Sequence, residues 1–245
     1  MKHIHINCDL GEGGENDAEL MPLISACNIA CGGHSGTVES MHDTVMLAME
    51  HNVEMGAHPS YPDKESFGRK TLSMTPENLQ QSLVAQILSL KQIAEALGGK
   101  LTHIKPHGAL YHDAATDEKI AQVVIDSILE FEDNFTIYAP QNSVISRLSE
   151  GKIEVVLEAF SDRNYEENYQ LVSREKPNAL ITKKEAVFQH LFLMFTEGKI
   201  RCENQKIIHS LASTFCLHSD TPNAVEILKY LQQRFRKKNI EISRL

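Results

Sequence analysis

The chain has 245 residues, a length that suits one large domain, and its 42% hydrophobic and 23% charged residues are typical of a soluble globular protein. Its formal net charge of −9 argues against a general nucleic-acid-binding surface, which would carry a basic excess. We find no apolar run of transmembrane length and no signal peptide, and the five cysteines are an odd number, so we expect free thiols in a reducing cytoplasm.

The first predicted strand, at residues 4–8, leads into a glycine-rich turn. Glycines this dense let a backbone approach a ligand closely, and Asp9 and Glu12 add two carboxylates to the turn. The phosphate-loop pattern GxxxxGK[ST] is absent from the chain, so a P-loop ATPase is not expected. After a predicted short helix at residues 16–24, a strand of small residues ends in a second glycine-rich turn, which carries His34.

An amphipathic helix is predicted over residues 38–49, because its apolar residues recur at helical spacing and Thr37 or Ser35 can cap its start. The strand that follows ends at His58, directly before a proline. A third strand is thus predicted to end in a polar side chain.

Thr75, followed by a proline, predicts the start of a long helix that a pair of glycines ends. The next strand runs into Lys105 and His107. Pro106 lacks an N–H group and Gly108 permits unusual backbone angles, so both residues favour a turn at this point. We therefore expect Lys105 and His107 to project from the end of a strand.

In the next part of the chain, Thr116 is predicted to cap a helix that runs to about residue 130. Strands are predicted at residues 135–139 and 154–160, with a short helix between them. The second of these strands ends at Asp162 and Arg163.

A polar loop at residues 164–176 is interpreted as a lid. Thr182 and Glu185 predict a capping box before the next helix. The last predicted strand leads into His218 and Asp220, and the Thr-Pro pair that follows predicts the start of the final helix.

About seven strands alternate with helices, a pattern that predicts a closed or nearly closed parallel (β/α) barrel over residues 1–245, treated as a single domain, with an open doubly wound sheet as the alternative. In a parallel barrel the carboxyl ends of the strands converge on one face. The side chains that we expect to share a pocket there are Asp9, Glu12, His34, His58, Lys105, His107, Asp162, Arg163, His218 and Asp220.

This set combines general acid and base groups with two cations that can bind anions. The chain has no GxSxG elbow, and no cysteine has a basic partner nearby in the sequence, so hydrolysis by water is favoured over a covalent serine or cysteine route. The same nitrogen and oxygen donors suit a divalent metal, but no HExxH helix fixes the ligands, so the metal is left open.

Six motifs together resemble the LamB/YcsF family, in the right order and from near the N-terminus to about residue 224. They are NCDLGEG at 7–13, NIACGGH at 28–34, GAHP at 56–59, KPHGALY at 105–111, DR at 162–163 and HSDTP at 218–222. The chain departs from the family pattern at Thr37, Ser66, Lys70 and Ser219, positions that bear on substrate detail more than on reaction class.

The resemblance implies a seven-stranded β/α barrel of the glycoside hydrolase/deacetylase type. It also implies a component of an ATP-dependent 5-oxoprolinase, which opens the lactam of 5-oxo-L-proline to L-glutamate with partner subunits B and C and with ATP as co-substrate. An unstrained five-membered lactam resists attack by water, so coupling to ATP makes chemical sense.

We predict two sets of site residues. The catalytic set is Asp9, His58, Lys105 and His107, and the substrate-binding set is Glu12, His34, Asp162, Arg163, His218 and Asp220. In this hypothesis Asp9, His58 or His107 activates water, while Lys105 and Arg163 hold a carboxylate or a phosphorylated oxygen. Two alternatives stay open, namely a stand-alone metal-dependent deacetylase or amidohydrolase and a non-catalytic subunit that binds a small acid.

Overall fold

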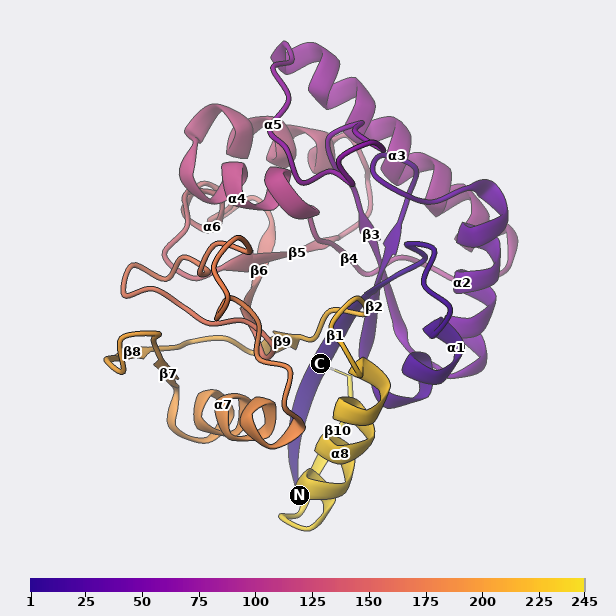
Figure 1. Cartoon of the computed structure of the whole chain (residues 1–245). Coiled ribbons are helices and arrows are strands. Elements are labelled where there is room, and N and C mark those ends of the chain that lie inside the picture. The colour runs from indigo at the N-terminus through magenta and orange to yellow at the C-terminus, as the bar shows by residue number, and fades with distance from the viewer. Residues whose placement is uncertain (245) are drawn as a thin grey trace.

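The computed structural model describes residues 1–244, and its main sheet is a closed barrel of seven parallel strands (Figure 1). The barrel strands are β1 (Lys2–Leu10), β2 (Ala26–Ala30), β3 (Glu54–His58), β4 (His103–Ile104), β5 (Thr136–Pro140), β6 (Glu154–Phe160) and β9 (Thr214–Cys216). They neighbour one another in that order, and β9 pairs with β1 to close the ring. The predicted parallel barrel is therefore confirmed, and the open doubly wound sheet is wrong.

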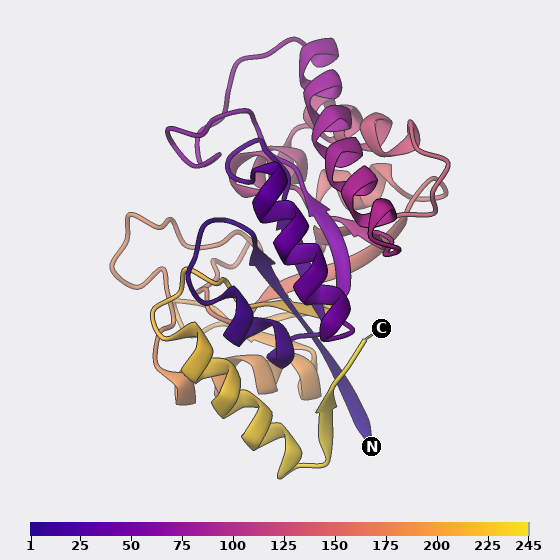
Figure 2. The same ribbon diagram turned by 90° about the vertical axis from the view of Figure 1, so that its right-hand side faces the viewer.

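Helices surround the barrel, as Figures 1 and 2 show. They are α1 (Asp17–Leu20), a 3-10 turn η1 (Met21–Leu23), α2 (Val38–Glu50), α3 (Pro76–Ala96), α4 (Gly108–Thr116), α5 (Glu118–Leu129), α6 (Val144–Leu148), α7 (Lys184–Glu197) and α8 (Ala224–Arg236). The apolar stripe of α2 is buried as predicted, with Met41, Val45 and Ala48 inward. None of the helices in residues 1–244 combines the length and the apolar character needed to span a membrane.

Two predicted helix caps are confirmed. The Thr37 hydroxyl accepts a hydrogen bond from the Ser40 N–H group, and the Ser40 hydroxyl accepts one from the Thr37 N–H group, which completes a capping box. Thr75 caps α3 by accepting from the N–H group of Asn78. Local sequence was sufficient here because both caps involve only neighbouring residues of the chain.

Three predicted helix starts are wrong. Thr116 is the last residue of α4, and Asp117 caps α5 instead. Helix α7 begins at Lys184 after Lys183, which makes no side-chain cap, so the predicted capping box of Thr182 does not form. The final helix begins at residue 224 rather than at Thr221, because the Thr221 hydroxyl donates to the buried carboxylate of Asp162.

The sequence patterns also missed three strands and one helix. A short antiparallel hairpin joins β7 (Lys199–Arg201) and β8 (Ile207–His209), and β10 (Ile240–Ile242) pairs in parallel with the first residues of β1. Helix α4 begins at Gly108, which has φ of +52° and lies so close to Gly68 that an added Cβ would meet its carbonyl oxygen at 2.5 Å.

Strand β1 alternates between two environments. Its even-numbered residues from Ile4 onward are apolar, whereas His5, Asn7 and Asp9 alternate with them and contact polar groups of other strands. All of these side chains are buried, so the barrel interior is polar. The loops that follow β3 and β6 extend on the same side of the barrel, at the left in Figure 2. Both loops contribute to the cavity at the carboxyl ends of the strands.

Candidate active site

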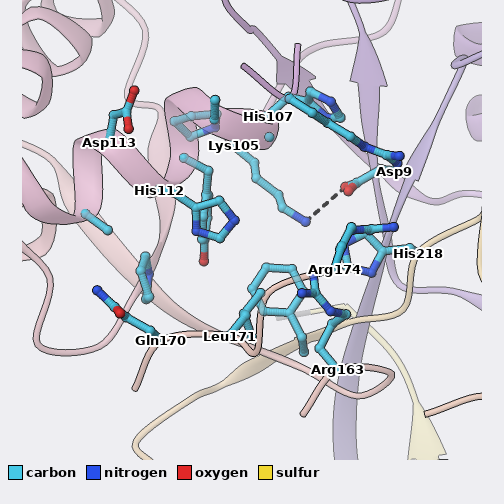
Figure 3. A pocket seen from close by; sticks show the side chains of 18 of the residues that line it. Asp9, Lys105, His107, His112, Asp113, Arg163, Gln170, Leu171, Arg174 and His218 are labelled. Carbon is cyan, nitrogen blue, oxygen red and sulfur yellow. Dashed lines mark hydrogen bonds and ion pairs between the residues drawn. The ribbon is translucent and has the colours of Figure 1, made fainter. Parts of the chain in front are cut away.

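A cavity of about 550 Å³ opens at the carboxyl ends of the barrel strands (Figure 3). Eight of the ten predicted site residues line it, namely Asp9, Glu12, His58, Lys105, His107, Arg163, His218 and Asp220. The other two lie directly behind the wall. His34 contacts Glu12 with 2.8 Å between Nε2 and Oε1, and Asp162 lies against His218.

Asp162 is fully buried, and its carboxylate supports the wall of the cavity. It accepts hydrogen bonds from the backbone N–H of His218 at 2.9 Å and from the Thr221 hydroxyl at 2.6 Å, and it lies 3.0 Å from His218 Nδ1. Burial alone would raise the pKa of Asp162, but His218 and the other donors lower it below its usual value. An ionised Asp162 therefore fixes the ring of His218 at the edge of the cavity.

Lys105 lies at the centre of the polar interior, with its ammonium directed towards Asp9 (Figure 3). Its Nζ is 2.9 Å from Asp9 and 3.0 Å from the buried carboxylate of Glu158. Burial would lower the pKa of Lys105, but the adjacent Asp9 raises it well above its usual value. Lys105 is therefore charged and already shared between two carboxylates.

The Asp9 carboxylate joins Lys105 to His58, whose Nε2 is 3.4 Å from Asp9 Oδ2. Burial would raise the pKa of Asp9, but His58 and Lys105 hold it well below its usual value. Burial would lower the pKa of His58, but the attraction of Asp9 outweighs this effect and raises it. Asp9 is therefore an ionised group that holds two cationic or donor side chains.

On the inner side of Asp9, polar side chains form a network that we call the closed network, made of His5, Asn7, Asn28, His103 and Thr214. Asn28 donates to Asn7 at 2.8 Å and to Asp9 at 2.7 Å, and its carbonyl lies 2.8 Å from His103 Nε2. Asn7 donates to the Thr214 hydroxyl, which also contacts His5 Nδ1 at 2.8 Å.

The remaining ring nitrogens of the closed network also have partners. The other ring nitrogen of His103 contacts the Thr102 hydroxyl, and the other ring nitrogen of His5 contacts Glu54. His103 packs flat on Tyr138 and against Gly56, where a side chain would strike the imidazole at 2.2 Å. Burial lowers the pKa of His103 far below its usual value, so its ring is neutral. Among the described residues, the closed network satisfies itself and leaves no ring nitrogen for a ligand.

On the cavity side of Asp9, a second group, which we call the open cluster, consists of Glu12, His34, His58 and His107. His107 Nδ1 lies 2.9 Å from His58 Nε2 and 3.3 Å from Glu12 Oε1. The rings of His34 and His107 are stacked with centroids 3.6 Å apart. Burial and the adjacent histidines lower the pKa of His107, so its ring is neutral. The four ligand atoms lie within 4.8 Å of one another, so this group could hold a metal ion.

Several buried polar atoms beside these groups have no hydrogen-bond partner within residues 1–244. They include His34 Nδ1, the Tyr111 hydroxyl and Glu158 Oε2. Tyr111 lines the cavity. Buried polar groups in folded proteins are normally paired, so these atoms have the capacity to bond to water or to a ligand.

The outer half of the cavity carries arginines that the sequence analysis did not select. Arg69 and Arg174 come from different loops and both contact Asp220 Oδ2, at 2.6 and 3.4 Å. Arg163 donates to the backbone carbonyls of Val172 and Ala179, which shapes the loop after β6. With three arginines and one exposed carboxylate, this half of the cavity is suited to an anionic ligand.

Sequence reasoning also missed Asn7, Asn28, Glu158 and Tyr111. Asn7 could have been found, because polar residues on every second position of an otherwise apolar strand can face a polar barrel interior. Glu158 lies within β6 rather than at its end, and Arg174 belongs to a loop without periodicity. No local pattern marks either of them.

Comparisons with known proteins agree over the whole chain. The model of the LamB/YcsF family matches residues 4–245. The A subunit of 5-oxoprolinase from Haemophilus influenzae (strain PittEE) is 35% identical over 244 residues, which are 99% of this chain and 100% of that protein. The lactam utilization protein from Thermus thermophilus is 32% identical, with a TM-score of 0.92 over 99% of each chain.

A more distant likeness concerns the fold alone. The peptidoglycan deacetylase PdaC from Bacillus subtilis superposes with a TM-score of 0.51 at 11% identity, over 100% of this chain and 88% of that one. This agrees with the predicted barrel of the deacetylase type.

Proposed function

The chain belongs to the LamB/YcsF family, and from that premise we propose that it is the component of an ATP-dependent 5-oxoprolinase that binds 5-oxo-L-proline and opens its lactam to L-glutamate. The observation that carries the proposal is one cavity in which buried acid and base groups adjoin a cationic outer half. A small cyclic amide that bears a carboxylate needs both of these environments. The relatives, which are named as the A subunit of 5-oxoprolinase and as a lactam utilization protein, support the same substrate.

The reaction needs ATP because the lactam carbon is a poor electrophile. Transfer of the terminal phosphoryl group of ATP to the lactam oxygen releases ADP and makes this carbon reactive. Water then adds to the carbon, the ring nitrogen takes a proton, and the C–N bond breaks to leave an amine and an acyl phosphate. A second water hydrolyses the acyl phosphate to the side-chain carboxylate of glutamate and inorganic phosphate.

In this proposal the inner groups of the cavity handle water and protons. The neutral ring of His107 accepts the proton from the attacking water through its open Nδ1, beside the Glu12 carboxylate, while His58 stays paired with the ionised Asp9. Lys105 keeps Asp9 ionised and stabilises negative charge that develops beside it. In this proposal the Tyr111 hydroxyl, which adjoins Glu158, donates to a substrate oxygen.

The substrate carboxylate is proposed to bind in the outer half of the cavity. Arg69 and Arg174 share a single oxygen of Asp220, so they retain donors for a second carboxylate. Arg163 supports them by holding the loop after β6, and His218 and Asp220 complete the wall. This proposal shifts carboxylate binding from Lys105, which is already engaged, to the arginines at the rim.

ATP and the partner subunits B and C belong to the assembly in this proposal. The chain has no P-loop motif, so we assign no nucleotide site to its own residues. The five cysteines are buried free thiols, which supports operation in a reducing cytoplasm.

The experiment is glutamate release from 5-oxoproline by the chain alone and with its B and C partners, each with and without ATP. We expect glutamate, ADP and phosphate only in the full mixture with ATP. Absence of all three products, with the partners shown to be folded and bound, would refute the proposal.

A second candidate is a stand-alone amidohydrolase or deacetylase, which the open cluster favours because such a group can also activate water without ATP. Cleavage of an acetylated sugar or a simple amide by the chain alone would select this candidate. ATP-dependent glutamate release would exclude it.

A further inference from the structure

The hydrogen bonds of two histidines fix which of their ring nitrogens carry a proton. His58 Nδ1 lies 2.7 Å from the carbonyl oxygen of Lys105, and His107 Nε2 lies 2.9 Å from the carbonyl oxygen of Phe67. A carbonyl oxygen can only accept, so each of these nitrogens must be the donor. In the neutral rings, the lone pairs are therefore on His58 Nε2 and His107 Nδ1.

These two lone pairs face each other, because His58 Nε2 and His107 Nδ1 are only 2.9 Å apart. With both rings neutral, neither can donate to the other, so the contact requires a positive charge at this point, either a proton on His58 or a bound metal ion. Two carboxylates approach the same point. Glu12 Oε1 is 3.3 Å from His107 Nδ1 and 3.8 Å from His58 Nε2, while Asp9 Oδ2 is 3.4 Å from His58 Nε2.

Three of these four distances, 2.9, 3.3 and 3.4 Å, are those of neighbouring ligands around one metal ion, and the fourth, 3.8 Å, is longer. At a metal–nitrogen distance of about 2.0–2.1 Å, two neighbouring ligand atoms lie about 3.0 Å apart at a right angle and about 3.4 Å apart at a tetrahedral angle. Ligating histidines also usually donate their other ring N–H to a carbonyl or carboxylate, which fixes the tautomer. His58 and His107 both do so.

One of the groups that orient the candidate ligands is a backbone carbonyl of a residue in an uncommon conformation. Phe67 adopts φ of +54°, an uncommon conformation for a non-glycine residue, and in it directs its carbonyl to His107. His34 lies 2.8 Å from Glu12 Oε1 and holds that carboxylate beside the two histidines. Each candidate ligand is thus oriented by a second residue before anything binds.

We propose that the open cluster binds one divalent transition-metal ion, with His58 Nε2, His107 Nδ1 and the Glu12 carboxylate as ligands and Asp9 at its edge. Nitrogen and carboxylate donors in this ratio suit Zn²⁺, Co²⁺ or Mn²⁺. When bound, such an ion would polarise an amide oxygen or a water molecule. The free oxygens of Asp9 and Glu12 would then remain as proton acceptors. Cation binding does not depend on the lactam reaction proposed above.

The test measures binding directly, without substrate, ATP or partners. The full chain is stripped with a chelator and dialysed, then titrated with Zn²⁺ by calorimetry and with Co²⁺ by visible absorption. We expect one ion per chain and a Co²⁺ spectrum typical of nitrogen and oxygen ligands. Failure to bind either ion at neutral pH would overturn the proposal and would mean that a shared proton joins the two histidines instead.

Two variants remove a lone pair and keep the supporting hydrogen bond. His58→Asn retains a donor near the position of Nδ1, and His107→Gln retains one near the position of Nε2. Each should weaken Zn²⁺ binding by at least about 10–100-fold, the loss that even a supporting partner of a ligand causes. Unchanged binding in the double variant would place the ion elsewhere and overturn the assignment.

The matched control is His103→Gln, which alters a buried histidine of the same barrel whose two nitrogens are already paired. It should bind one ion with affinity within about threefold of the parent. If it does not fold, the exposed His42→Gln replaces it. Loss of binding in a folded control variant would overturn the assignment to the open cluster alone. Zn²⁺ binding without glutamate release would separate this inference from the proposed function.

Discussion

The closed network and the open cluster occupy the same barrel, use similar residue types and are both largely buried, yet they differ in how completely their polar atoms are paired. In the closed network each histidine nitrogen and each asparagine amide has a partner within the protein. In the open cluster the facing nitrogens of His58 and His107 would both carry lone pairs if their rings were neutral, and His34 Nδ1 has no partner in the described part of the chain. Burial of polar side chains therefore does not identify the site, whereas unfilled hydrogen-bonding capacity does.

His103 and His107 show this difference within five residues of chain. His103 lies in β4 and is neutral, stacked and fully bonded. His107 lies just beyond the strand, with one nitrogen held by a backbone carbonyl and the other open to the cavity. The distinction depends on which strands come together around each ring, and no pattern in the sequence records it.

The largest effect should follow from Lys105→Met. This change removes the charge shared by Asp9 and Glu158, which leaves the buried Glu158 without a counter-ion and Asp9 with His58 alone. Breaking a buried ion pair in this way costs about 3–5 kcal/mol of unfolding free energy. Urea unfolding measures the loss, and glutamate release in the full assembly should also disappear. Lys199→Met, which removes a partly exposed ion pair with Glu197, is the control, and equal stability of the two variants would show that Lys105 does not link the two groups.

Next in size is the effect of His107→Gln on turnover. The variant keeps the donor to the Phe67 carbonyl and loses the open nitrogen, so the fold should persist while the rate falls. Removal of a general acid or base typically costs about 10²–10⁴-fold. Steady-state assays with 5-oxoproline, ATP and the partner subunits measure it. A loss of less than about tenfold would mean that the open nitrogen has no part in the reaction.

His190, a buried histidine outside the barrel, tests whether a ring nitrogen without a hydrogen-bond partner is enough to make a site. His190 Nε2 has no partner within residues 1–244, and burial lowers the pKa of His190 to about 4. Between about pH 6.5 and 4 the unfolded chain binds a proton that the folded chain does not, so stability falls as the pH falls, by up to about 3 kcal/mol from this group. Urea unfolding measures the free energy of unfolding of the parent and of His190→Leu. As the pH falls over this range, that of the parent should decrease relative to that of the variant. Parallel pH profiles would contradict the assignment.

In the closed network, His103→Leu should reduce stability rather than catalysis. It leaves the Asn28 carbonyl without its donor, an unsatisfied buried group that costs about 1–3 kcal/mol. The rate constant for turnover should stay within about tenfold of the parent at a temperature where the variant is folded. A large loss of turnover at unchanged stability would place His103 in the site and remove the distinction between the two groups.

The smallest effect is expected at the rim. Arg69→Ala and Arg174→Ala each remove one cation from the outer cavity, where water screens the interaction. We expect KM for 5-oxoproline to rise about tenfold, or about 1.4 kcal/mol, with a smaller change in kcat. If only kcat falls, these arginines act on the transition state rather than on the bound carboxylate.

Much of the fold could be predicted because strands and helices leave local patterns. Most barrel strands are followed closely by glycine, proline or charged residues, and those ends located Asp9, His58 and His107. The prediction of a helix start was wrong where a tertiary contact competed for the expected capping residue, as when the Thr221 hydroxyl donates to Asp162. The residues in the interior of the site were not predicted for a related reason. A polar residue within a strand has the same spacing whether it faces solvent or another strand.

The barrel closes by bonding its first strand to its last ones, since β1 pairs with both β9 and β10. A nascent chain leaving the ribosome therefore carries β1 with one edge unpaired until residues beyond 214 have been synthesised. Contacts between such distant residues form slowly, because a long loop must close before they stabilise anything. Until then the incomplete barrel exposes an open strand edge and the inward polar side chains of β1. An unpaired strand edge can pair with another chain, so late closure of the ring favours aggregation before synthesis is complete.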